Sequence, residues 1–262
     1  MKIIMYHSLT VSIRPVADFE TLNYQIMTNL NTSTEATITD EPAIGFIPCY
    51  RLPFLSLFHA DCMEIMKQYP DKYFDLAIVD PPYGLGESVV NSGGRFKRYH
   101  NKNGNWDINT PNAEYFNELQ RVSKQQIIWG GNYFELPPNK CFIVWDKGQP
   151  EDISFAMAEY AWTSFDKVAK IYNKRTQGQE QRFHPTQKPK DLYAFTLKHF
   201  ATEGMKILDT HFGSGSIALA VDKANRLDKM NLHLTACEID KEYIDKAIKR
   251  ISESIKQGTL SF

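Results

Sequence analysis

The feature that most constrains the fold is an alternation of short apolar strands with helix-like segments, which runs from about residue 52 to about residue 255. The run Phe74–Val79 is continuously apolar, as is typical of a strand buried on both faces of a parallel sheet. This alternation predicts an α/β fold with a mostly parallel, twisted sheet and helices on both of its faces. The predicted strands are 55–60, 74–79, 126–129, 141–145, 160–164, 206–209 and 232–237, and the predicted helices are 62–68, 111–123, 188–201, 213–224 and 241–255.

The first 45 residues differ from the rest of the chain. The stretch 29–39 reads NLNTSTEATIT, which is polar and has weak periodicity. A length of 262 residues suits one domain, or one domain with an arm. We therefore predict an N-terminal extension of unknown role at 1–45 and a single folded domain at 46–262.

Composition excludes several classes of protein. The 30 Lys and Arg residues balance 31 Asp and Glu residues, which excludes a uniformly basic nucleic-acid coat but leaves room for local basic patches. No apolar run approaches the length of a membrane span, and the first residues do not resemble a secretory signal, so we expect a cytoplasmic protein. The four cysteines lie far apart without a C-x-x-C pair, which argues against disulfides and against a zinc site; no metal is expected.

A glycine-containing turn joins a predicted strand to a predicted helix at 209–216, which reads DTHFGSGS. Gly213 and Gly215 permit a tight turn and close approach of a ligand to the backbone. The turn is neither a Walker motif nor a complete G-x-G-x-x-G, because Ala218 fills the third position. Glu238 ends the next predicted strand, where a carboxylate can bind both hydroxyls of a ribose. Together these features favour a nucleoside cofactor.

The tetrapeptide Asp80-Pro81-Pro82-Tyr83 follows the buried strand 74–79, at the end where open α/β sheets place their sites. Asp80 and the Pro81 carbonyl are hydrogen-bond acceptors, the two prolines stiffen the turn, and Tyr83 provides a flat aromatic face. Such a rigid pair of acceptors beside an aromatic ring suits a planar heterocycle that carries an exocyclic amine.

On these residues the chain resembles the DNA amino-methyltransferases that depend on S-adenosylmethionine (SAM) and act on adenine N6 or cytosine N4. D-P-P-Y matches their catalytic motif, the glycine turn matches their cofactor motif, and His184–Pro189 (HPTQKP) matches a third signature. The catalytic motif precedes the cofactor motif, as in the circularly permuted beta class. The matches span about residues 52–255 and imply a Rossmann-like methyltransferase fold.

The resemblance also implies a role for individual residues. Asp80, Pro81, Pro82 and Tyr83 would be catalytic. The residues implied to bind the cofactor are Asp61, His184, Thr186, Lys188, Asp209, Phe212, Gly213, Gly215, Glu238 and Ile239. Within this set Glu238 would hold the ribose, Ile239 would pack on the adenine, and Lys188 would lie near the methionine end of SAM. The chain departs from the family's D-P-F-x-G-S-G-T pattern at Thr210, His211 and Ser216.

The expected reaction is methylation of adenine N6 in double-stranded DNA. Hydrogen bonds from both amine hydrogens to Asp80 and the Pro81 carbonyl would localise the nitrogen lone pair, so that catalysis rests on positioning and preorganised electrostatics. The base must be flipped out of the duplex to reach the site, with Tyr83 as its stacking partner. Asp in place of Ser at position 80 favours adenine over cytosine.

Two basic stretches are candidate DNA contacts, in loops at about 85–110 and 166–183. The first includes NSGGRFKRYHNKNG at 91–104, which has no acidic residue, and the second is part of a basic stretch at 166–190. The predicted contacts are Arg95, Lys97, Arg98, Lys102, Lys174 and Arg175. Further partners to consider are a second copy of the chain and a cognate restriction enzyme.

Three alternative interpretations stay open. The first is a cytosine-N4 DNA methyltransferase, because the preference for adenine that Asp80 indicates is not absolute. A catalytically silent SAM- or nucleotide-binding module would share the glycine turn, but the intact D-P-P-Y tetrad argues against it. An NAD-dependent dehydrogenase would also share the glycine turn, and it would leave D-P-P-Y and H-P-T-Q-K-P without a role.

Overall fold

The computed structural model describes residues 45–85, 110–150, 156–174, 183–184 and 187–259. Within them the strands are β1 (Tyr50–Leu52), β2 (Leu55–His59), β3 (Phe74–Val79), β4 (Ser123–Trp129), β5 (Phe142–Asp146), β6 (Ala158–Thr163), β7 (Lys170–Asn173), β8 (Lys206–Asp209) and β9 (His233–Glu238). The helices are α2 (Cys62–Lys67), α4 (Ala113–Val122), α5 (Lys190–Phe200), α6 (Ser216–Asp228) and α7 (Lys241–Thr259), with a 3-10 turn, η2, at Gly131–Tyr133. The predicted extension at 1–45 lies outside the described residues except for Gly45.

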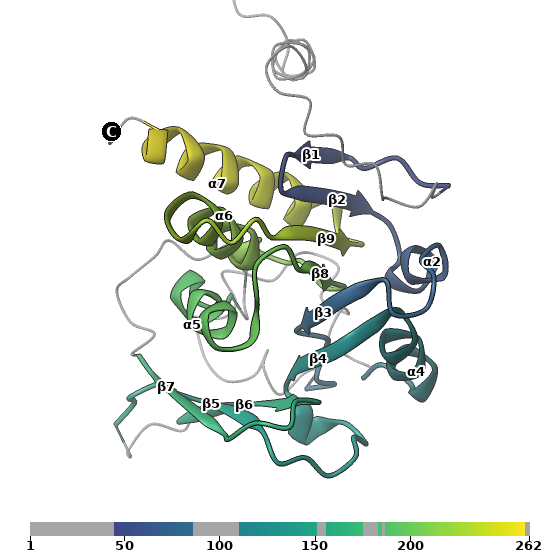
Figure 1. Ribbon diagram of the computed structural model, residues 1–262, viewed down its shortest axis with the longest axis vertical. Helices are drawn as coiled ribbons and strands as arrows, with labels where there is room; N and C mark the ends of the chain where they lie inside the picture. Colours follow the sequence, from purple (N-terminus) through teal and green to yellow (C-terminus); the bar gives the residue numbers. More distant parts are fainter. Residues whose placement is uncertain (1–44, 86–109, 151–155, 175–182, 185–186, 260–262) are drawn as a thin grey trace, which may run out of the picture. The chain divides into compact units, whose positions relative to one another are not determined.

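These strands form one sheet in the order β1-β2-β9-β8-β3-β4-β6-β5-β7 (Figure 1). The central strands β2, β9, β8, β3 and β4 all run parallel, whereas β1 and β6 pair antiparallel with their neighbours. The predicted mostly parallel α/β sheet is confirmed. Its parallel part places the ends of β2, β9, β8 and β3 along one edge.

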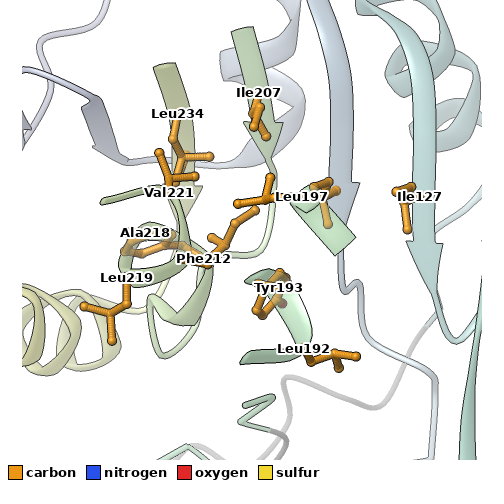
Figure 2. Packing of buried hydrophobic residues seen from close by; sticks show 14 of the residues in the cluster. Ile127, Leu192, Tyr193, Leu197, Ile207, Phe212, Ala218, Leu219, Val221 and Leu234 are labelled. Atoms are coloured by element: carbon orange, nitrogen blue, oxygen red, sulfur yellow. The ribbon is translucent and has the colours of Figure 1, made fainter. Parts of the chain in front are cut away.

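Alternating side chains of the central strands build two apolar cores, one on each face. Leu76 and Ile78 of β3 face the core beneath α5, α6 and α7, whereas Ala77 and Val79 face the core beneath α2 and α4. Figure 2 shows the first of these cores, in which Leu197 of α5 and Val221 of α6 gather beside strand residues such as Ile207. Each such fully buried aliphatic side chain stabilises the fold by roughly 1.5–3 kcal/mol.

Several elements differ from the sequence prediction for local reasons. Helix α6 begins at Ser216, three residues later than predicted, because Gly213 and Gly215 have φ angles of +51° and +70°, which a right-handed helix does not accommodate. The short edge strands β1 and β7 were not predicted, since three or four residues show little periodicity. The predicted DNA-contacting loop at 166–183 therefore contains a strand. None of the described helices combines the length and the apolar character needed to cross a bilayer.

Candidate functional site

Four carboxylate residues that are far apart in the sequence lie at or just after the ends of four neighbouring strands, along one edge of the sheet. Parallel pairing of β2 with β9, of β9 with β8 and of β8 with β3 fixes their spatial order. Along the edge, Asp61 comes after β2, Glu238 ends β9, Asp209 ends β8 and Asp80 comes after β3. The sheet thus brings the D-P-P-Y turn beside the glycine turn, although 129 positions separate Asp80 from Asp209 in the chain.

Glu238 is held by the backbone of the two segments around it. Its Oε2 accepts the N–H of Gly213 at 2.8 Å, and its Oε1 accepts the N–H groups of Ile239 at 2.9 Å and Asp240 at 3.0 Å. Burial raises the pKa of Glu238, and these N–H donors oppose the rise. The adjacent Ile239 is 67% exposed. An oriented carboxylate beside an exposed apolar side chain fits the ribose and the base of a nucleoside.

Asp209 lies deeper in the same edge and is almost completely buried. It accepts the N–H of His211 at 3.0 Å. Burial raises its pKa to about 8, and the His211 N–H opposes that rise only in part. A positively charged ligand group would restore its ionised form, so this position also fits a cationic cofactor such as a sulfonium amino acid.

Two of the three positions that depart from the family pattern, Thr210 and His211, form a polar network with Tyr115 of α4. The hydroxyl groups of Tyr115 and Thr210 are 2.6 Å apart, and Thr210 Oγ1 lies 2.9 Å from His211 Nδ1. Tyr115 also meets the His211 ring edge-on, with 5.5 Å between centroids. Burial lowers the pKa of His211 to about 4, so the ring is neutral at physiological pH. Tyr115 was missed in the sequence, where it reads as an ordinary apolar residue of an amphipathic helix.

The D-P-P-Y turn is held by side chains from distant segments. Tyr83 donates to Asp80 Oδ1 at 2.5 Å, and Lys188 Nζ lies 2.5 Å from Asp80 Oδ2. The same ammonium donates to the Tyr83 hydroxyl at 3.1 Å and lies 3.3 Å from Oε2 of Glu159 on β6. Lys147 in turn pairs with Glu159 at 2.7 Å. Glu159 and Lys147 were not predicted as site residues, because no motif marks them.

Aromatic side chains pack around Tyr83. Its ring is stacked on Tyr133, with 5.0 Å between centroids and 14° between planes, and meets Phe134 at 6.1 Å in an edge contact. Gly130 lies so close that a Cβ there would be 2.2 Å from the Tyr83 ring. Tyr133 is 44% exposed, so a flat ring next to the catalytic turn is open to a ligand.

Other predicted cofactor residues take different positions around this edge. Asp61 caps α2 by accepting the N–H of Met63 at 2.7 Å. His184 lies beside Gly213 and contacts the Tyr243 ring, with 4.3 Å between centroids. Phe212 is buried in the core beneath α5, α6 and α7 (Figure 2). The structure places Lys188 on Asp80, and Thr186 lies outside the described residues.

The predicted DNA contacts are mostly beyond the described residues. Arg95, Lys97, Arg98, Lys102 and Arg175 fall there. Lys174 is described, and its ammonium pairs with Asp191 at the start of α5. The described residues thus bring together the catalytic and cofactor motifs, and the DNA-binding assignments stay predictions.

Comparison with known proteins agrees with this geometry. Residues 128–249, which include the glycine turn, Glu238 and Lys188, match the family model described as DNA methylase for N6 and N4 enzymes. Over these residues the chain is similar to the N6/N4 DNA methyltransferases. The resemblance stated from the sequence is therefore confirmed, together with SAM as the cofactor of this methyltransferase. The D-P-P-Y tetrad lies before the matched residues.

Two individual proteins are similar to this methyltransferase over most of its length. The type II methyltransferase M.ScaI of Streptomyces caespitosus is 21% identical over an alignment that covers 78% of this chain and 83% of M.ScaI. The solved structure of the PvuII DNA methyltransferase, described as cytosine-N4-specific, is 11% identical with a TM-score of 0.54 and covers 82% of this chain and 95% of its own. The likeness to the PvuII structure shows that the fold is shared, as predicted.

Proposed function

We propose that this DNA methyltransferase transfers a methyl group from SAM to N6 of an adenine that has been flipped out of duplex DNA. The observation that carries the proposal is the pairing of β3 with β8, which sets the D-P-P-Y turn directly beside the glycine turn. An acceptor for the target amine and a pocket for the methyl donor are then neighbours at one sheet edge.

SAM supplies a methyl group on a positively charged sulfur, which leaves as a neutral thioether when a nitrogen displaces it. The chain's own residues would bind and orient it. Glu238 would accept both ribose hydroxyls while its backbone donors keep the carboxylate in place. Ile239 would cover the adenine with apolar surface, and Asp209 would favour the positive charge of the cofactor. Asp61 would bond the adenine amine.

The D-P-P-Y turn would hold the target amine. Each oxygen of the Asp80 carboxylate already accepts one hydrogen, and each retains a lone pair for an amine hydrogen. The Pro81 carbonyl would take the second amine hydrogen. Held between them, the nitrogen keeps its lone pair directed at the methyl group, and Asp80 can accept the proton that the methylated amine then loses. Tyr83, with Tyr133 beside it, offers the ring on which the base stacks.

Asp at position 80 supports adenine over cytosine as the target base. The test is expression in a bacterial host that has no DNA methylation of its own. Mass spectrometry of the nucleosides should find N6-methyladenine, and single-molecule sequencing should find it in one sequence context. If N4-methylcytosine is found instead, the target base is cytosine and the proposal of adenine is wrong. A host that expresses Asp80→Ala serves as the matched control.

The basic stretch 91–104 supports direct contact between the protein and DNA phosphates. The homodimer, the cognate restriction enzyme and the cytoplasmic location remain predictions. Replacement of Arg95, Lys97 and Arg98 by Ala should lower DNA affinity and leave SAM binding intact. The slope of log K against log salt should fall by up to about 0.9 for each phosphate contact that is lost. An unchanged slope would shift the DNA-contact assignment to the basic stretch at 166–190.

A further inference from the structure

The most unusual charge in the described part of the chain is that of Lys188. Its side chain is only 1% exposed, and its ammonium lies 5.5 Å from the centroid of the Tyr83 ring and 5.4 Å from that of Trp129. A buried cation is costly unless it is paired and hydrogen-bonded. Lys188 meets this requirement through Asp80 and Glu159, which come from two different strands. The pairing is thus built by the tertiary fold.

The charges around this ammonium are balanced. Asp80 after β3 and Glu159 on β6 are the anions in contact with it, and Lys147 after β5 is the second cation, in contact with Glu159. Further titratable groups near this cluster are Asp209 of β8, His184, Tyr83 and Tyr193 of α5. The two lysines and the two carboxylates in direct contact carry no net charge together.

We propose that Lys188 is the counter-ion that keeps the catalytic Asp80 ionised, and that Glu159 is a positioning residue that holds the Lys188 ammonium on Asp80. The inference rests on the proposed function, because it explains how Asp80 stays able to accept hydrogen bonds from the target amine. It gives Lys188 a different task from the one that the family resemblance implies, namely contact with the methionine end of SAM.

The physical reason lies in the environment of Asp80. Burial raises the pKa of Asp80, the Lys188 ammonium opposes the rise, and the Glu159 carboxylate adds to it. Without the ammonium, the pKa of Asp80 would be higher still, and its carboxyl group would be protonated more readily. One of its oxygens would then become a donor and could no longer accept an amine hydrogen. The acid limb of the rate profile reports this protonation, because the rate falls as pH drops through the pKa of Asp80.

The experiment measures single-turnover methyl transfer between pH 6 and 10 at saturating SAM and DNA, with SAM affinity from calorimetry. In Lys188→Gln the acid limb should move to higher pH, by up to about 3–5 units for a fully buried carboxyl, so that the rate at pH 7 falls at least tenfold and recovers as pH rises. SAM affinity should stay within about threefold of wild type, which is less than the change that the loss of one hydrogen bond to SAM would cause. The Lys188 carbonyl, which accepts the Ser216 hydroxyl at 2.7 Å, is kept in this variant.

Three further variants separate positioning from charge. In Lys188→Gln/Glu159→Gln the acid limb should lie below that of Lys188→Gln, because the like charge beside Asp80 is gone. In Glu159→Gln alone the plateau rate should fall severalfold without a change in SAM affinity. Lys188→Arg keeps the charge and should keep the acid limb near that of wild type, which also preserves the test if Lys188→Gln does not fold.

The matched control is Lys140→Gln, which breaks the exposed pair with Asp166 and should leave the pH profile unchanged. An unshifted acid limb in Lys188→Gln combined with weakened SAM binding would overturn the proposal in favour of a cofactor contact. If Lys188→Gln does not fold, a shifted acid limb in Lys188→Arg or an unchanged plateau in Glu159→Gln would overturn it. If the wild-type protein itself transfers no methyl group to DNA, the proposed function fails instead.

Discussion

Glu238 and Asp80 stand two strands apart on the same sheet edge, yet they are held in opposite ways. Glu238 is fixed by backbone N–H groups of Gly213, Ile239 and Asp240, which are close to it in the fold whatever their side chains are. Asp80 is fixed by the side chains of Tyr83 and Lys188, and Lys188 is itself held by Glu159. The part of the edge that we propose to bind the cofactor is therefore held by the main chain, whereas the D-P-P-Y turn that we propose to be catalytic depends on a network of side chains.

This difference predicts that the two halves of the site fail separately. Changes around Asp80 should lower the rate of methyl transfer and leave the cofactor affinity intact, because none of the contacts of Glu238 passes through Asp80. Changes at Glu238 or Asp209 should first alter SAM binding. The four predictions below test this separation.

The largest effect is expected for Asp80→Ala. Loss of one preorganised polar group at a reacting centre typically costs about 10²–10³ in rate, and methyl transfer should fall by at least that much. Calorimetry should find SAM affinity close to that of wild type. Near-normal transfer by the variant would remove Asp80 from the catalytic assignment.

The second-largest effect is expected for Glu238→Ala, which should weaken SAM binding and largely spare the rate of methyl transfer. A charge-assisted contact to both ribose hydroxyls is worth about 1.5–3 kcal/mol, so SAM affinity should fall by about tenfold to a hundredfold. The rate at saturating SAM should change much less. Glu242→Ala, which removes an exposed carboxylate that pairs with Lys246, is the control. A dissociation constant equal to wild type would place Glu238 outside the pocket.

The third prediction concerns the pH dependence of SAM binding. Because burial raises the pKa of Asp209 to about 8 in the free protein, the group is mostly protonated below that pH. A cationic cofactor favours the ionised form, so binding releases a proton there, and affinity should fall by up to about tenfold per pH unit below pH 8. Titrations in buffers of different ionisation enthalpy measure that proton. Asp209→Asn should abolish the dependence, and its persistence would point to another group.

The smallest effect is expected for Gly130→Ala. A Cβ at this position would meet the Tyr83 ring, and the φ angle of +69° strains any residue with a side chain. We expect a loss of about 1–3 kcal/mol in the free energy of unfolding, measured in urea. Methyl transfer should fall severalfold while SAM affinity is kept, because Tyr83 belongs to the catalytic turn. Gly204→Ala has a similar φ angle of +77° but open space around it, and it separates backbone strain from the contact with Tyr83.

Much of the fold was readable in the pattern of residues. The strand 74–79 was predicted to the residue, and α5 and α7 were predicted within a few residues, because long periodic segments carry strong local signals. The glycine turn, D-P-P-Y and Glu238 were also recognisable, since each needs a rare residue type at a fixed place. Glu159 and Lys147 were not, because a charged residue in a partly polar strand resembles any solvated position.

The amino-acid sequence alone thus determined the fold class, the two motif turns and the chemistry expected of each, because these depend on local residue types and spacing. It did not determine which turn lies beside which. That was decided when β8, late in the chain, paired in parallel with β3, early in the chain. The role of Lys188 was decided in the same way, since only the tertiary fold brings its ammonium between the carboxylate of Asp80, which follows β3, and that of Glu159 on β6. Contacts between residues far apart in sequence leave no local periodicity, and for that reason the tertiary structure alone carries them.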